Sequence, residues 1–313
     1  MPPKILVITG PTASGKTALA VELALRHNGE VVSADSMQIY RRMDIGTAKP
    51  DLAERKGVPH HMLDVADPEE DFSVARYVEM AAQSIDGILS RGRLPILAGG
   101  TGLYVDSLLS GRTFAQFDPA SSLRGELDAE FEQLGGEAML EQLRTVDPEA
   151  AAKLHPRDRK RIVRALEVFR STGKTITQHN LETQAIPSRY DALTLTLTFD
   201  DRQLMWDRID RRVDVMMAAG LVDEVKALLD SGVPDSCTAM QAIGYKEMAA
   251  ALRGSGDVQA AAEEIKLRSR QYAKRQLTWF RRNAAAKPLL TGTPAYFARA
   301  LQASTAYLEE FGI

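Results

Sequence analysis

A glycine-rich segment placed directly after the first apolar run is the feature that most constrains the fold. The run at 4–9 is followed by Gly10, Pro11, Thr12, Ala13, Ser14, Gly15, Lys16 and Thr17. In this strand, loop and helix order, the backbone N–H groups of the loop and the following helix N-terminus wrap the oxygens of a polyphosphate. The lysine reaches the outer phosphate, and the threonine hydroxyl can bind Mg²⁺. The segment therefore predicts a phosphate-binding loop in an α/β domain.

The loop alone leaves the chemistry open, because kinases, ATPases and GTPases all share it. These proteins normally hold Mg²⁺ with an additional Asp at the end of another strand. The best candidate strand, 93–98, runs instead into Gly99, Gly100 and Thr101, with no acidic residue. This departure argues against a routine nucleoside triphosphatase.

Composition indicates a soluble globular protein. The chain has 313 residues, of which 44% are hydrophobic, and no apolar run reaches the roughly 18 residues that span a bilayer. Because the first predicted strand begins within four residues of the start, we expect no signal peptide, a cytoplasmic location and no membrane contact. The single Cys237 excludes an internal disulfide and a cysteine-based zinc site, and we expect it to be a small buried hydrophobe.

Positive charge is concentrated in two places on a chain whose net charge is −3. Residues 266–282 hold seven Lys and Arg and no acid, and residues 155–174 hold seven against two acids. Clustered cations are typical of surfaces that bind a polyanion such as a nucleic acid. Solvated helix faces are the alternative, and charge alone does not separate the two.

Periodicity predicts a parallel sheet covered by helices. Apolar runs at 4–9, 30–33, 61–65 and 94–98 are separated by segments of helix length, which is typical of repeated β-α-β units. A fifth strand at 193–199 alternates Leu and Thr. Helices are predicted near 201–218, 221–231, 240–252, 257–282 and 294–309.

The stretch between the fourth and fifth strands predicts an inserted helical domain. Segments 121–134, 137–145, 148–154 and 158–171 have helical spacing and end at glycine or proline signals. The predicted fold class is therefore α/β, a P-loop-like parallel sheet flanked by helices with a small all-helical insertion. The expected domains are a core of 1–117 and 186–313 and an insertion of 118–185.

Ordered sequence blocks resemble the tRNA dimethylallyltransferases over most of the chain. The N-terminal blocks are the phosphate loop, SADSMQIY at 33–40, DIGTAKP at 44–50, PHHMLD at 59–64 and AGGTGLY at 98–104. The later ones are HP at 155–156, Arg161, RALEV at 164–168, GK at 173–174, IGYK at 243–246 and AKRQLTWF at 273–280. The resemblance is to the bacterial type, because a single cysteine cannot form the C-terminal zinc finger of the eukaryotic members.

The resemblance implies transfer of a dimethylallyl group from dimethylallyl diphosphate. The acceptor would be N6 of the adenosine just 3′ of the anticodon, position 37, in tRNAs reading codons that begin with U. Diphosphate would be a leaving group held by residues 10–17, with catalytic help from Lys16 and with Mg²⁺ on Thr17. Arg208 is the preferred further clamp on the diphosphate, and Arg212, one turn later, is the alternative.

The resemblance also assigns the acceptor side. Asp35, after the second strand, would remove a proton from N6, although a residue so placed can also cap a helix. Thr101 would contact the diphosphate or the nucleoside, with an N-cap again as the alternative. The residues expected to contact tRNA are Asp35, Ser36, Met37, Gln38, Thr101, Arg159, Lys160, Arg161, Ile162, Val163, Gln241, Ala242, Ile243, Gly244, Tyr245 and Lys246.

Three other functions compete with this interpretation. The cytokinin-forming enzymes prenylate free adenine nucleotides, but they lack the full helical insertion and its basic helix. A small-molecule kinase would need the missing strand-end carboxylate, and a nucleotide-gated RNA-binding module would not need Asp35 at the sheet edge. We expect the chain to act as a monomer.

Overall fold

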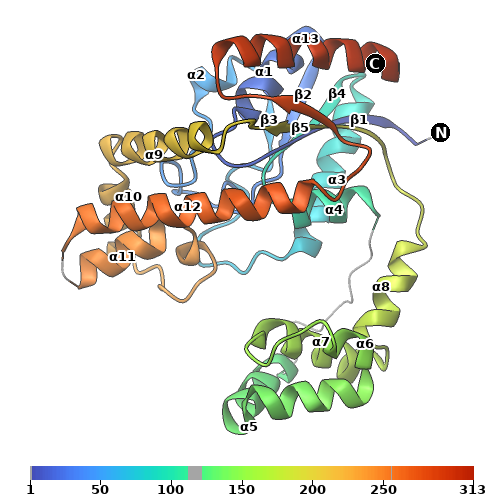
Figure 1. Cartoon of the computed structure of the whole chain (residues 1–313), viewed down its shortest axis with the longest axis vertical. Coiled ribbons are helices and arrows are strands. Elements are labelled where there is room, and N and C mark those ends of the chain that lie inside the picture. The colour runs from blue at the N-terminus through green and yellow to red at the C-terminus, as the bar shows by residue number, and fades with distance from the viewer. Residues whose placement is uncertain (1, 112–121, 255) are drawn as a thin grey trace. The chain divides into compact units, whose positions relative to one another are not determined.

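The computed structural model describes residues 2–111, 122–254 and 256–313 (Figure 1). The chain divides into two units, one of Met1–Leu109 with Arg189–Ile313 and one of Ser110–Ser188. The first predicted domain boundary, between 117 and 118, lies outside the described residues, and the second, at 185, lies close to the end of the smaller unit. None of the described helices is long and apolar enough to cross a membrane.

The larger unit is built on a six-stranded sheet whose recorded pairings are all parallel. The strand order is β3-β2-β4-β1-β5-β6. The strands are β1 Lys4–Thr9, β2 Gly29–Ser33, β3 His60–His61, β4 Leu94–Ala98, β5 Asp191–Thr198 and β6 Lys287–Leu290. The predicted fold class is confirmed, and four of the five predicted strands lie where the apolar runs placed them.

One strand prediction was wrong, and one strand was missed. The strand predicted at 61–65 is only two residues long, because Met62 and Asp64 take left-handed backbone conformations, with φ of 63° and 56°, that end the pairing. Strand β6 was not predicted. It contains Pro288, which is tolerated at a sheet edge, and only one of its four residues is buried.

The central strand β1 is buried on both faces. Ile5 and Val7 point into the core formed with α3 (Val74–Ser90) and α4 (Gly102–Leu109), and Leu6 and Ile8 point into the core formed with α1 (Lys16–Arg26) and α13 (Pro294–Phe311). Successive side chains of a strand alternate between faces, so a doubly covered strand reads as a continuous apolar run. This explains why β1 was predicted with its observed bounds.

The four helices between β5 and β6 build one side of the unit. They are α9 Arg202–Ala218, α10 Leu221–Asp230, α11 Tyr245–Arg253 and α12 Val258–Phe280. A separate short helix, α2 (Leu52–Arg55), lies between β2 and β3. Helix α12 packs along α9 and α11 (Figure 1). The helix predicted at 240–252 is divided in the structure. A 3₁₀ turn, Ala239–Gln241, precedes α11, and Gly244 takes φ 102° between them.

The smaller unit is entirely helical in its described part. Its helices are α5 Leu123–Val146, α6 Pro148–Ala151, α7 Arg159–Thr172 and α8 Ile176–Gln184. Helix α5 is interrupted at Gly135, where φ is 81° and ψ is 163°, so the two predicted helices on either side of this glycine are confirmed. Helix α8 was not predicted; Asp147 binds the N–H and hydroxyl of Thr177 near its start.

An ionic cluster joins the ends of β2 and β4 that lie away from the loops described below. Glu30 on β2 is 2% exposed and accepts hydrogen bonds from Arg91 at 2.7 and 3.1 Å, from Arg93 at 3.1 Å and from His61 at 2.7 Å. The hydrogen bonds from Arg91 are the main cause that lowers the pKa of Glu30 to about 2. The carboxylate is thereby kept ionised although it is buried.

We predict that Glu30→Gln reduces the free energy of unfolding by roughly 2–4 kcal/mol at neutral pH. Because the folded-state pKa is depressed, the contribution of Glu30 is present above pH 4.5 and is lost as the pH falls towards about 2. Urea denaturation of both proteins between pH 7 and pH 3 should show a shrinking deficit. A difference in unfolding free energy that did not change with pH would contradict this account. The matched control is Glu69→Gln, which breaks an exposed ion pair with Arg42.

Candidate active site

The loop between β1 and α1 has the backbone of a phosphate cradle. Gly10, Ala13 and Gly15 have φ of 146°, 61° and 90°, so three of the six residues from 10 to 15 take positive φ. A Cβ atom on Gly10 would lie 2.8 Å from the carbonyl oxygen of Leu197, so the approach of β5 requires glycine here. The loop then enters α1, whose first N–H groups have no partner inside the helix.

Side chains from three regions hold the carbonyl groups of this loop. Lys16 Nζ donates to Pro11 O at 2.7 Å, Arg208 Nε to Ala13 O at 2.9 Å, and Thr291 Oγ1 to Ser14 O at 2.8 Å. With these carbonyls engaged, the N–H groups are the part of the loop that can bind an anion. Ser14 Oγ is buried and has no hydrogen-bond partner among the described residues, so it can also donate to a phosphate oxygen.

Lys16 lies next to a second cation, Arg212 on α9. Desolvation by the surrounding atoms and the Arg212 guanidinium together lower the pKa of Lys16 to about 7, and the Asp35 carboxylate opposes them. Desolvation also lowers the pKa of Arg212, and its Nε is buried without a partner in the described part of the chain. Two partly desolvated cations that repel each other favour binding of an anion with more than one charge.

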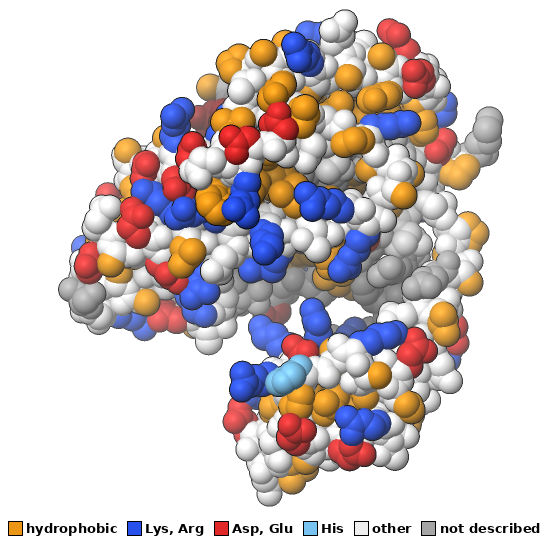
Figure 2. All heavy atoms as spheres, viewed as in Figure 1, with side chains coloured by type: hydrophobic (Ala, Val, Ile, Leu, Met, Phe, Trp, Pro, Cys, Tyr) orange, Lys and Arg blue, Asp and Glu red, His pale blue; other side chains and the backbone are white. Residues whose placement is uncertain are grey.

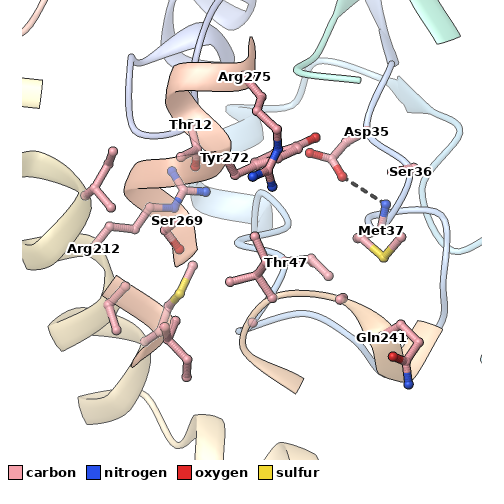
Figure 3. Close-up of a pocket in the computed structure, with 17 residues that line it drawn as sticks. Thr12, Asp35, Ser36, Met37, Thr47, Arg212, Gln241, Ser269, Tyr272 and Arg275 are labelled. Carbon is pink, nitrogen blue, oxygen red and sulfur yellow. Dashed lines mark hydrogen bonds between the residues drawn. The ribbon is translucent and has the colours of Figure 1, made fainter. Parts of the chain in front are cut away.

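Asp35 follows β2 at the carboxyl edge of the sheet. Its Oδ1 accepts the backbone N–H of Met37 at 2.9 Å and, less directly, that of Gln38 at 3.4 Å. The alternative predicted from the sequence was a helix cap, but residues 36–39 form a turn, so Asp35 caps a turn instead. These hydrogen bonds engage only one of the two carboxylate oxygens of Asp35. Figure 3 shows that the carboxylate faces Tyr272 inside a pocket. Capping therefore orients Asp35 and leaves its second oxygen for a ligand.

A pocket of about 310 Å³ joins these groups (Figure 3). Thr12 and Arg212 line it on the side of the phosphate loop. Met37 and Gln241 line it on the other side, with Asp35 between them. The remaining lining residues are Ser36, Gly46, Thr47, Ile209, Val213, Met216, Ala242, Ile243, Ile265, Ser269, Tyr272 and Arg275.

Helix α12 connects the loops that surround the pocket. Gln276 is 6% exposed; its Oε1 accepts the N–H of Thr12 at 2.8 Å and its Nε2 donates to Gly100 O at 2.9 Å. Thr101, after β4, accepts the N–H of Ser36 at 3.0 Å through Oγ1. Desolvation, and then the Asp35 carboxylate, raise the pKa of Tyr272 to about 12, so its phenol stays protonated and can donate.

The structure distinguishes between the two arginine candidates on α9. Arg208, which the sequence favoured, donates to Ala13 O and to Gly292 O at 3.2 Å, so it holds the loop. Arg212 lines the pocket and has the unpartnered Nε. The role of Arg208 towards diphosphate stays a prediction. Tyr272, Arg275 and Ser269 were missed as lining residues, although the basic and aromatic pattern of 266–282 was the signal for them.

Residues predicted to contact tRNA differ in accessibility. In the larger unit, Gln241 and Lys246 are exposed, but Tyr245 is fully buried and bonded to Glu224, and Gly244 is buried. Gln38 is engaged with the backbone of Thr47 and Ala48.

In the smaller unit, Ile162 and Val163 are 0% and 1% exposed and pack in the core, so their side chains are not available to a partner. Arg159 is paired with Asp128 and Glu132. Lys160 and Arg161 are the exposed members of the predicted stretch.

The residues present suit Mg²⁺ only in combination with a phosphorylated ligand. Among the described residues no group of three or more His, Cys, Asp or Glu could hold a metal ion. Mg²⁺ is commonly bound by one or two protein oxygens with phosphate oxygens and water completing its shell. The hydroxyl of Thr17, at the start of α1, can supply such a single ligand beside the phosphate cradle.

Comparison with known proteins agrees with this geometry. The family model described as IPP transferase matches residues 38–283. A tRNA dimethylallyltransferase of Acetivibrio thermocellus is 49% identical over 278 residues, covering 89% of this chain and 88% of that protein. The tRNA dimethylallyltransferase 1 of Pelobacter propionicus is 47% identical and covers 98% of both.

Solved structures give the same result. The crystal structure of the full-length tRNA isopentenylpyrophosphate transferase of Bacillus halodurans matches with a TM-score of 0.72 and 42% identity, covering 98% of this chain and 97% of that one. A eukaryotic dimethylallyltransferase acting on tRNA matches with a TM-score of 0.84 and 30% identity, covering 98% of this chain and 80% of that one. The chain therefore belongs to the IPP transferase family, that of the tRNA dimethylallyltransferases.

Proposed function

We propose that the protein transfers a dimethylallyl group from dimethylallyl diphosphate to N6 of an adenosine in tRNA and releases diphosphate. The observation that carries this proposal is one pocket in which Asp35 lies between the end lined by Thr12 and Arg212, beside the phosphate loop, and an uncharged end. More finely, we propose the adenosine just 3′ of the anticodon, position 37, of tRNAs reading codons that begin with U. We also propose that the protein acts as a monomer.

At the cationic end the loop 10–17, Lys16 and Arg212 would bind the diphosphate. As the bond between the allylic C1 and the diphosphate oxygen breaks, the electron pair leaves with the diphosphate, and charge grows on its oxygens. Fixed N–H groups and cations stabilise that growing charge more than they stabilise the substrate. We propose Mg²⁺ as the cofactor; when bound to Thr17 and the phosphates, it would neutralise part of this charge.

At the other end the adenine would enter beside Met37 and Gln241. Its N6 lone pair is delocalised into the ring, so a carboxylate that accepts the N6 proton while the N6–C1 bond forms would increase its nucleophilicity. Asp35 is placed for this role, and its bonded Oδ1 fixes the direction of the free oxygen. A base inside an anticodon loop must leave its stack to reach such a pocket.

Two basic surfaces support RNA as the acceptor. In the first part of the basic run 266–282 the cations are neutralised. Lys266 pairs with Asp214 at 2.7 Å, and Arg268 and Arg270 pair with acids on α12 and α9. In the rest of this run, at the end of α12 and just after it, four exposed cations have no ion pair within the described ranges: Lys274, Arg275, Arg281 and Arg282. Figure 2 shows Lys and Arg side chains along this face of the larger unit. The smaller unit adds Lys160 and Arg161.

The first test concerns the base. Asp35→Asn keeps the shape of the side chain and its turn but cannot accept a proton. We expect kcat for transfer of label from dimethylallyl diphosphate to an anticodon stem-loop to fall by about 10²–10⁴-fold. Affinity for the stem-loop should change little. A variant that retained wild-type kcat would exclude Asp35 as the base.

The second test concerns the anion site. Because Lys16 has a pKa of about 7, binding of a diphosphate should restore its charge and take up a proton. Calorimetry with inorganic diphosphate at pH 8, in buffers of different ionisation enthalpy, should show up to about one more proton taken up by wild type than by Lys16→Arg, which stays charged. At pH 6 the difference should disappear. Equal proton uptake by both proteins at pH 8 would contradict the assignment.

The third test concerns the smaller unit. Arg161→Ala should weaken stem-loop binding and reduce the slope of log affinity against log salt by roughly 0.7–0.9, the value for one phosphate contact. Affinity for inorganic diphosphate should not change. Arg170→Ala, on the same helix but paired with Glu130, is the control. Equal effects of the two substitutions would indicate that Arg161 makes no specific phosphate contact.

A further inference from the structure

One carboxylate outside the pocket binds the backbone of a loop that lines it. Glu224 on α10 is half-buried, and its Oε2 accepts the N–H groups of Asp44 at 2.9 Å and Ile45 at 2.8 Å. Its Oε1 accepts the N–H of Gly46 at 3.0 Å. Three consecutive N–H groups converging on one anion form a nest, a geometry usually filled by a bound anion. Here the protein's own side chain fills it.

The same carboxylate also binds α11. Tyr245, the first residue of α11, donates its hydroxyl to Glu224 Oε1 at 2.5 Å. Its ring is fully buried, and a Cβ on Gly46 would lie 2.5 Å from its Cε2 atom. Burial, followed by the charge of Glu224, raises the pKa of Tyr245 well above its usual value, which keeps the hydroxyl a donor. Glu224 therefore joins the loop at 44–46 to the segment that leads into α11.

These two segments form one part of the pocket wall. Gly46 and Thr47 line it from the loop, and the segment 241–243 lines it from the approach to α11. In Figure 3, Gln241 lies on the opposite side of the pocket from Arg212. Lys49, at the other end of this loop, also binds the side chain of Asp44, together with that of Asp64, each at 2.6 Å, and these contacts do not reach residues 241–243. Glu224 is thus the connection between the two segments at the uncharged end.

We propose that Glu224 is a positioning residue for the acceptor base, acting through residues 46–47 and 241–243. The proposal rests on the proposed function, since it assumes that the nucleoside enters at the end away from the phosphate loop. Glu224 itself does not line the pocket, and it has no contact with the loop at 10–17 among those recorded for the described residues. Its loss should therefore affect the acceptor and leave the donor site intact.

The test is a comparison of KM values in Glu224→Gln. Glutamine keeps the shape, but its NH₂ group replaces one accepting oxygen and faces backbone donors. We expect KM for an anticodon stem-loop to rise about tenfold, the scale of one well-placed hydrogen bond, while KM for dimethylallyl diphosphate and the affinity for inorganic diphosphate stay within about twofold. Tyr245→Phe, which removes one of the four donors, should shift the acceptor KM in the same direction by less.

Glu30→Gln is the matched control. It also removes a hydrogen-bonded carboxylate, which is buried near the start of β2 and away from the pocket, and should lower stability without changing the ratio of the two KM values. Transfer by the wild type, together with a Glu224→Gln variant whose two KM values rise equally or not at all, would overturn the positioning role alone. Absence of transfer by the wild-type protein would overturn both this role and the proposed function.

Discussion

Parallel pairing of the sheet is the constraint on which the site depends. Because β1, β2 and β4 run in the same direction, the phosphate loop, Asp35 and Thr101 all emerge at one edge. Gln276 then fixes two of these loops to each other by accepting from Thr12 and donating to Gly100. A diphosphate and a nucleoside bound at this edge would meet at Asp35 without any change in the sheet.

The sequence predicted this core well because its signals are local. A doubly buried strand is a continuous apolar run, and the phosphate loop depends on glycines at fixed positions, so β1 and the residues 10–17 could be found without a structure. The length of β3 was predicted wrongly and β6 was missed, because their signals are not local. Their limits depend on backbone turns at Met62 and Asp64 and on pairing with β5, which no periodicity records.

Site residues contributed by distant helices were harder to predict. Arg208 and Arg212 are one turn apart on α9 and look equivalent in sequence, yet one binds Ala13 O and the other lines the pocket. Counting Lys and Arg in the sequence also did not show which of these cations are paired with acids. In the sequence, residues 266–282 form one basic run. In the structure, acids on α9 and α12 pair with the cations of its first part, and the cations of its second part stay exposed. Only tertiary packing shows which cations remain for a polyanion.

The most direct measurement of the central claim is the destination of the allyl group. Labelled dimethylallyl diphosphate, Mg²⁺ and the full chain would be incubated with an anticodon stem-loop carrying adenines at the last anticodon position and its 3′ neighbour, and with AMP in the same reaction. Digestion to nucleosides would then locate the label. The account predicts label on N6 of the 3′ neighbour alone. Label on AMP, or on neither acceptor, would contradict it.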